Sequence, residues 1–396
     1  MAKRNPRFTL LAFMLAGLLA ACSGAPEAPD GDKMDGPAKF AYQAGVVPPF
    51  VPAEQVRSDW AKVEESQKPK QVAVKGIYLT SYTATNPAAF QPLLDLVERT
   101  ELNAMVVNVK DDWGNITFEV EHPIAKAAGA IHPDFMDMRG FTGLLRSKDV
   151  YSIARVVTFK DGNVPKVRPD LAAASTAGGI WRDYNGVSWL NPYSRAAWDY
   201  VVDIAKEAAL AGFDEIQFDY VRFPTDGNMS LLSYPGKDNR EPAQVIADFL
   251  AYAKKELHPF GVVVSADVFG LVTSLYDDLG IGQHLETIGD GVDVISPMVY
   301  PSHYIPGNLG LSNPNAMPYE TIYRSMLDAK GRWEKAGLTG KVTMRPWLQD
   351  FSWGHPYGPK EVRDQIQATY DAGYEQWILW NAANEYTEAA LNPAKP

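Results

Sequence analysis

The chain has 396 residues, of which 46% are hydrophobic and 21% are charged, and its formal net charge is −11 at pH 7. This length and apolar content suffice for a large buried core, and a barrel of roughly 250 residues with extensions would fit. An acidic chain is poorly suited to nucleic acid, whose phosphates require a basic surface. A neutral or cationic substrate is therefore expected, although net charge does not fix the local charge of a cleft.

The first 21 residues have the pattern of a bacterial export signal. Three basic residues, Lys3, Arg4 and Arg7, precede an apolar run that is too short to span a bilayer comfortably. The segment carries no acidic residue, so the remainder has 34 basic and 48 acidic residues, a net charge of −14. We expect residues 1–21 to be removed as a signal peptide.

The signal ends in Leu-Ala-Ala-Cys, with the cysteine at position 22. This resembles the bacterial lipobox, which implies lipidation of Cys22 as the mature N-terminus and a lipid-anchored envelope protein. Ser23 follows, which in a Gram-negative cell resembles the default for outer-membrane sorting. Cys22 is the single cysteine, so it cannot form a disulfide within the chain. The alternative is a free structural thiol.

Residues 22–70 are predicted to be the lipidated cysteine and a flexible tether. The part up to Pro37 is rich in Ala, Pro, Gly and Asp and cannot bury a core. The prolines at 48 and 49 favour an extended segment. The charged stretch Ser58–Lys70 is compatible with one short helix. We place the folded domain at residues 71–396.

From Val72 onward, short β-rich runs alternate with helix-like runs, which favours parallel βα units. The eight strand candidates are Val72–Thr80, Ala104–Val109, Tyr151–Thr158, Glu215–Tyr220, Val262–Val268, Val292–Pro297, Val342–Leu348 and Gln376–Trp380. The clearest helices are Pro87–Thr100, Arg195–Ala211, Pro242–Leu257, Tyr319–Ala336 and Pro359–Ala372. The expected fold is an α/β protein, a (β/α)8 TIM barrel with long βα loops. A doubly wound open sheet is the alternative, but no Gly-rich dinucleotide fingerprint follows the first strand.

Two connections, 110–150 and 160–192, are too long for plain turns, and long loops in compact domains are often functional. They follow strand candidates, so we expect them to wall a cleft above the barrel. They contain Trp113, Trp181 and Trp189 among polar residues, which makes these rings candidate platforms for a sugar.

The segment from Gly212 to Pro224 places Asp219 and Arg222 at the C-terminal end of a strand, where (β/α)8 barrels carry their catalytic residues. The next strand candidate brings Asp267 to an equivalent depth. We predict that Asp219 is the nucleophile or base, that Asp267 is the proton donor, and that Arg222 lowers the pKa of Asp219. For Asp219 and Arg222 the alternative is a structural pair that holds a loop. For Asp267 it is a helix N-cap or a hydrogen-bonded barrel residue.

The other strand ends supply carboxylates, amides and flat aromatic rings, the set that sugar hydrolysis requires. The predicted substrate-binding residues are Tyr78, Asn108, Lys110, Asp111, Trp113, Tyr300, Arg345, Trp347, Gln349, Trp380 and Asn381. Asp111 and Asp112 compete as a source of the second carboxyl, but adjacent strand residues point oppositely, so at most one would face the cleft. Trp347 and Trp380 could equally be barrel packing.

Other chemistries are disfavoured. The six histidines are scattered, and neither HExxH nor CxxC spacing occurs, so no transition-metal site or cofactor is expected. There is no GxSxG elbow and no phosphate-binding loop. A nucleophilic cysteine is excluded because Cys22 belongs to the export signal.

The segment 212–224 resembles the signature of a glycosyl hydrolase TIM-barrel family, long known as a domain of unknown function. Further blocks match at Lys75–Tyr78, Asn108–Asp111, Ser265–Gly270, Ser296–Tyr300 and Arg345–Phe351, and the resemblance covers about residues 72 to 390. It implies a barrel distantly similar to α-amylase-like glycosidases, whose nucleophile is an Asp ending the fourth strand; that role carries onto Asp219. The amylase-like acid ending the fifth strand would be Glu, whereas this chain has Asp267.

Three functions remain open at this stage. The first is a lipid-anchored glycoside hydrolase that acts on an envelope or extracellular polysaccharide. The second is a non-catalytic carbohydrate-binding lipoprotein, and the third is an envelope scaffold for which the tether would matter most. The presence of Asp219, Asp267 and Arg222 together favours the enzyme, because charged groups in a barrel mouth are costly without a role. We expect Asp219 and Asp267 to face one cleft.

Overall fold

The computed structural model describes residues 72–132 and 137–394, so the predicted signal, Cys22 and the tether lie outside the described residues. The principal strands are β1 (Lys75–Leu79), β2 (Ala104–Lys110), β3 (Tyr151–Val157), β5 (Glu215–Asp219), β7 (Val263–Phe269), β8 (Val294–Met298), β9 (Thr343–Met344), β10 (Trp347–Gln349) and β11 (Trp377–Trp380). They form one sheet in the order β10-β11-β1-β2-β3-β5-β7-β8-β9, and an additional β8–β10 pairing closes it. The pairings are parallel. Since β9 and β10 share one position, the sheet is an eight-stranded barrel, which confirms the (β/α)8 fold.

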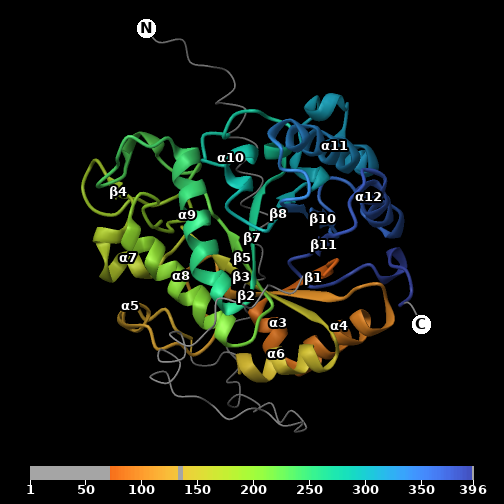
Figure 1. The fold of residues 1–396 in the computed structure, drawn as a ribbon, viewed down its shortest axis with the longest axis horizontal. Coiled ribbons are helices and arrows are strands. Elements are labelled where there is room, and N and C mark those ends of the chain that lie inside the picture. The colour runs from red at the N-terminus through yellow and green to blue at the C-terminus, as the bar shows by residue number, and fades with distance from the viewer. Residues whose placement is uncertain (1–71, 133–136, 395–396) are drawn as a thin grey trace.

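Helices lie between the strands and surround them (Figure 1). They are α3 (Ser81–Thr85), α4 (Pro87–Arg99), α5 (Pro123–Ala127), α6 (Met138–Ser147), α7 (Val164–Val167), α8 (Arg195–Leu210), α9 (Pro242–Leu257), α10 (Leu285–Gly289), α11 (Pro318–Ala336) and α12 (Pro359–Asp371). Among the described residues, none of these helices has the length and apolar character needed to cross a membrane.

Local sequence explains where the main helices begin. The Asn86 side chain accepts a hydrogen bond from Ala88 N ahead of α4, and the Ser194 side chain accepts one from Ala197 N ahead of α8. Proline occupies the first turn of α4, α9, α11 and α12, where its missing N–H costs nothing. After α8, Gly212 adopts a φ of +102°, a left-handed conformation that suits glycine and turns the chain into β5.

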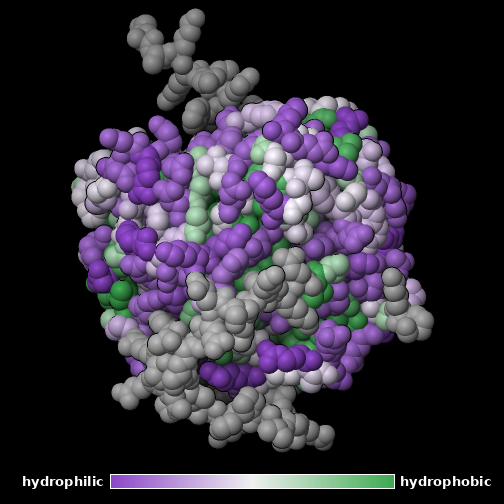
Figure 2. Space-filling model, in the orientation of Figure 1, coloured by the Kyte–Doolittle hydropathy of each residue, from purple (hydrophilic) through white to green (hydrophobic). Residues whose placement is uncertain are grey.

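Two hydrophobic clusters form the core. The larger fills the space between the strands and the helices. The smaller lies inside the barrel and contains Tyr78, Tyr151, Tyr300, Trp347 and Trp380. The outer surface is mainly hydrophilic on the face shown in Figure 2, with small scattered hydrophobic areas. The barrel interior therefore combines this apolar cluster with buried polar side chains, among them Arg155, Gln217 and Asp267.

The two long connections are structured. The first contains α6, which the sequence analysis did not predict because Gly140 and Gly143 lower its helix propensity. The second contains α7 and β4 (Ala174–Ser175), at one side of the barrel (Figure 1), and β4 pairs antiparallel with β6 (Leu232–Ser233) of the loop after β5. The connection 110–150, expected as a long loop beside a cleft, is thus helical over Met138–Ser147.

Candidate active site

Two carboxylates lie at one level inside the barrel, on the neighbouring strands β5 and β7. Their register pairs Gln217 with Ser265 and Phe218 with Ala266, so Asp219 and Asp267 are the next positions along. The two side chains interact electrostatically. Asp219 is 7% exposed and Asp267 is 1% exposed. The structure therefore brings the predicted pair together at the C-terminal end of the strands, with Asp219 the more accessible member.

Arg155 of β3 organises this level of the barrel. Its Nε donates to Asp219 Oδ2 at 2.9 Å, and its Nη2 donates to the same oxygen. It also donates to Asn108 Oδ1 at 2.7 Å and to Asp112 Oδ1 at 3.1 Å. The other oxygen of Asp219 accepts from Tyr220 N at 2.6 Å. These bonds fix the orientation of the Asp219 carboxylate, and Arg155 balances its charge. We call Arg155, Asn108, Asp112, Asp219 and Asp267 the upper layer.

Asp267 has a different environment. Burial raises the pKa of its carboxyl well above the ordinary value, and the charge of Asp219 raises it further. The hydrogen bond from Trp347 Nε1, 2.7 Å from Oδ1, and the charges of Arg155 and Arg345 oppose the shift. A carboxyl that keeps its proton is suited to act as a general acid. The Trp347 contact equally fits the alternative interpretation of Asp267 as a hydrogen-bonded barrel residue.

The predicted partnership between Asp219 and Arg222 is wrong. Arg222 Nη1 instead donates to Phe223 O at 3.1 Å and to Thr225 Oγ1 at 3.4 Å. The reason is the backbone between them: Tyr220 has a φ of +47°, a left-handed conformation that is uncommon for a non-glycine residue and turns the chain after β5.

Aromatic residues from four strand ends border the pair. Tyr78 and Trp380 stack with ring centroids 4.1 Å apart, and Trp347 meets Trp380 edge-on at 5.6 Å. Asn108 Nδ2 donates to Tyr78 Oη at 2.7 Å, which joins this group to Arg155. Tyr300 belongs to the same buried cluster. The structure thus groups five predicted binding residues next to the carboxylates.

The two other predicted residues of the β2 end have structural contacts. Lys110 is completely buried, with Nζ 2.9 Å from both Val157 O and Asp161 Oδ2, so its ammonium group is engaged in structural contacts. Asp111 accepts from the backbone N–H groups of Trp113 and Asn115 and holds its own loop together. Asp112, which was not among the predicted binding residues, is the acid that meets Arg155.

Three predicted residues near the end of the chain also have structural partners. Arg345 makes a two-pronged ion pair with Glu215 deep in the barrel. Gln349 is buried and bonds Ser302 N and Phe351 O. Asn381 donates to Asp350 O at 2.6 Å and accepts from Ala383 N, which shapes the turn after β11.

Of the three loop tryptophans, only Trp113 has the expected exposure, at 56%. Trp181 and Trp189 are buried, and their indole N–H groups donate to Asn228 O and Asp183 Oδ2 respectively. Their assignment as sugar platforms is therefore wrong, because both belong to the packing of the long connection. Trp353, which follows β10 and was not proposed, is 40% exposed.

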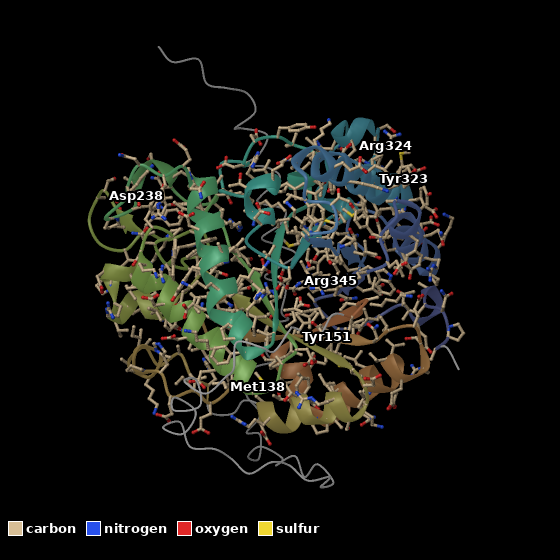
Figure 3. All side chains as sticks on the ribbon, in the orientation of Figure 1. Met138, Tyr151, Asp238, Tyr323, Arg324 and Arg345 are labelled. Carbon is tan, nitrogen blue, oxygen red and sulfur yellow. The ribbon has the colours of Figure 1, made fainter. Side chains whose placement is uncertain are left out.

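The ion pair between Arg345 and Glu215 lies below the upper layer and belongs to a second polar level of the barrel. Ser265 Oγ donates to Glu215, and the Tyr151 hydroxyl bonds it as well. Figure 3 shows Tyr151 and Arg345 near the centre of the barrel, whereas Asp238 and Arg324 lie at its periphery. We call Tyr151, Glu215, Ser265 and Arg345 the lower layer. Over residues 72–132 and 137–394, no cluster of His, Cys, Asp and Glu has the arrangement of a metal site.

The sequence matches the family described as "Putative glycosyl hydrolase domain" over residues 76–386. This match spans most of the chain, and the chain belongs to that family. The barrel and its strand-end carboxylates thus define a member of a glycosyl hydrolase family, and a carbohydrate is the class of substrate that such membership implies.

Two solved structures illustrate the likeness. A hypothetical protein from Ruminiclostridium thermocellum is 38% identical, over 52% of this chain and 98% of that one, with a TM-score of 0.44. The glycoside hydrolase domain of PgaB (BpsB) from Bordetella bronchiseptica is 14% identical, with a TM-score of 0.58 over 78% of this chain and 94% of that one. At that identity the second likeness concerns the fold alone. A search of curated proteins found no match.

Proposed function

We propose that the protein is a lipid-anchored glycoside hydrolase that cleaves O-glycosidic bonds of an envelope or extracellular polysaccharide with two carboxyl groups. The observation that carries the proposal is the pairing of Asp219, held by Arg155, with Asp267, whose carboxyl has a raised pKa. Two carboxyls with different proton affinities are the requirement of the reaction. Family membership and the barrel support the same class of reaction.

In this proposal, Asp267 gives its proton to the oxygen of the departing sugar as the C–O bond breaks. Asp219 either attacks the anomeric carbon or takes a proton from the attacking water. Arg155 positions Asp219 and balances its charge, so the carboxylate reaches the sugar in one orientation. Trp347 orients Asp267 through its indole N–H, and the stacked rings of Tyr78 and Trp380 are buried at the level of the carboxyls, where they help to shape the site.

The anchor is part of the same proposal and rests on the sequence alone. Lipidation of Cys22 would hold the barrel at a bacterial membrane through the tether, on the outer membrane if the cell is Gram-negative. A Cys22→Ala variant should move from the membrane fraction to the soluble fraction and keep its glycan-cleaving rate. Retention of the variant in the membrane fraction would contradict the lipid anchor.

The hydrolase is tested by a glycan screen on the domain from residue 72, with released reducing ends as the readout. Asp219→Asn is run beside the wild type, and Glu119→Gln is the matched control, because Glu119 is an exposed carboxylate in the loop after β2. Release by the wild type and the control but not by Asp219→Asn supports the proposal. Binding of a glycan without release by any of the three would favour the carbohydrate-binding lipoprotein.

A further inference from the structure

A second group of buried charges lies beside the upper layer. Asp226, in the loop after β5, is 6% exposed, and neither of its carboxylate oxygens accepts a hydrogen bond from another of the described residues. Burial raises the pKa of this carboxyl, as does nearby Asp183, whereas Arg222 and Lys160 oppose the shift. An acceptor with two unused oxygens in a buried position is costly unless something supplies donors.

The two cations near Asp226 also have unused capacity. Arg222 is 4% exposed, and its hydrogen bonds to the described residues employ Nη1 alone. Lys160 is 5% exposed, and its Nζ lies 3.7 Å from Asp183 Oδ2, longer than a hydrogen bond. These donors could have paired with Asp226, but the fold holds the three groups apart.

The positions of the cations are fixed by aromatic rings. The Arg222 guanidinium lies 5.0 Å from the ring centroids of Trp189 and Tyr220 and 4.8 Å from that of Phe269. Lys160 Nζ lies 5.1 Å from the Tyr220 ring. Tyr220 directly follows Asp219, and Phe269 comes two residues after Asp267. The group therefore adjoins the proposed catalytic carboxyls.

Asp183 shows what a structural carboxylate at this place looks like. It accepts from the N–H groups of Asn185 and Val187 and from Trp189 Nε1, so its oxygens are fully used. With Asp183 counted, the two cations and two anions balance. A ligand that bore a net charge would leave one charge unmatched, whereas hydroxyl groups donate to a carboxylate and accept from a cation at once.

We propose that Lys160, Arg222 and Asp226 form a subsite that binds a neutral, hydroxyl-bearing sugar unit next to the bond that Asp219 and Asp267 cleave. This inference deepens the proposed function and rests on it for the identity of the neighbouring bond. Asp226 accepts from sugar hydroxyls, and Arg222 and Lys160 donate to their oxygens.

The first test needs no ligand. At pH 8, Asp226→Asn removes a buried charge whose oxygens accept no hydrogen bond from another described residue, and it should raise the thermal midpoint by about 2–4 °C. Asp183→Asn is the matched control: it can put an amide N–H where Trp189 Nε1 donates and beside the Lys160 ammonium, so its midpoint should fall. An unchanged or lower midpoint for Asp226→Asn would mean that Asp226 stabilises the fold, and would overturn the subsite.

The second test measures binding in an Asp219→Asn background, by titration with three β-1,4-linked hexasaccharides: cellohexaose, its glucosamine analogue and its glucuronate analogue. Cellohexaose should bind most tightly, and Asp226→Asn should weaken its binding about tenfold. Tightest binding of a charged analogue, no binding of any of the three, or an unchanged affinity in Asp226→Asn overturns the subsite.

Cleavage of the same three sugars by the wild type separates the two proposals. If the wild type cleaves a sugar but Asp226→Asn binds it as tightly as before, the subsite is wrong and the hydrolase proposal stands. If Asp226→Asn binds more weakly but the wild type cleaves none of the sugars, the subsite stands and the hydrolase proposal is wrong.

Discussion

The two polar layers inside the barrel share the strands β3, β5 and β7 and differ in how their charges are matched. The upper layer adds Asn108 and Asp112 from the β2 end, and the lower layer adds Arg345 from between β9 and β10. In the lower layer, Glu215 faces one arginine in a two-pronged pair and also accepts from Ser265. In the upper layer, Arg155 contacts both Asp112 and Asp219, and Asp267 receives its hydrogen bond from Trp347.

Access differs as well. The side chains of the lower ion pair are each 1% exposed, whereas those of Asp219 and Asp112 are 10% and 21% exposed. A closed, two-pronged ion pair is costly to break, which suits a structural layer, whereas an excess of carboxyls with partial access can perform acid–base chemistry. We therefore assign the reaction to the upper layer, and the variants described below test this assignment.

The largest effect is expected for Asp219→Asn. Loss of the nucleophile or base should lower kcat on the cleaved glycan by about 10³-fold or more, because neither role survives in an amide. The thermal midpoint, measured in parallel, should show a folded variant, because the amide oxygen still accepts from Arg155 and Asp112 still faces its charge. Residual activity within a factor of about three of wild type would remove Asp219 from the chemistry.

Asp267→Asn should cost about 10²–10⁴-fold in rate on a sugar leaving group, the usual contribution of a general acid. The pH profile of the wild type should show in which direction this group titrates. Because the pKa of Asp267 is raised, the protonated donor persists at neutral pH, and kcat/KM of the wild type should fall as pH rises through that pKa. If the same fall in kcat/KM at high pH persists in Asp267→Asn, another group is responsible for it.

Substitutions in the lower layer should lower the stability of the fold rather than the rate of the reaction. Arg345→Met leaves Glu215 buried without its partner, which should cost about 3–5 kcal/mol in the free energy of unfolding. Denaturant titration measures it. Arg168→Met, which breaks an exposed ion pair with Asp170, is the control and should change little. Equal effects of the two variants would show that the lower layer is not structural.

The smallest effect is expected at the exposed rim. Trp113→Ala should raise KM about 2- to 12-fold and leave kcat unchanged, the range expected for loss of one aromatic contact. Trp181→Phe, at a buried position, should change stability and not KM. If KM is unaffected by Trp113→Ala, the rim at β2 does not contact the substrate.

Much of the fold follows from local patterns. Residues Pro242–Leu257 form α9 as predicted, because Pro242 marks its first turn. The position of Asp219 also follows from sequence, since Pro224 and the apolar alternation locate the end of β5. Helix α6 was not predicted because its two glycines lower the helix propensity of the segment. The signal that could have found it is Asp137, whose side chain caps the helix by accepting a hydrogen bond from Gly140 N.

The partners in the site could not be read from spacing. Asp219 and Arg222 are three residues apart and suggest a pair, but the left-handed turn at Tyr220 separates them. Arg155 lies 64 positions away and reaches Asp219 because β3 and β5 are neighbours in the barrel. Similarly, Trp189 stands among polar residues, and burial of the second long connection became evident only from its three-dimensional packing.

The most direct test of the account is cleavage in water enriched in ¹⁸O, with mass spectrometry of the reducing-end products. The account predicts that wild-type products each carry one ¹⁸O at the new reducing end and that Asp219→Asn forms none. Products without ¹⁸O that contain a new double bond would show elimination rather than hydrolysis, and labelled products from Asp219→Asn at the wild-type rate would place the catalytic carboxyl elsewhere.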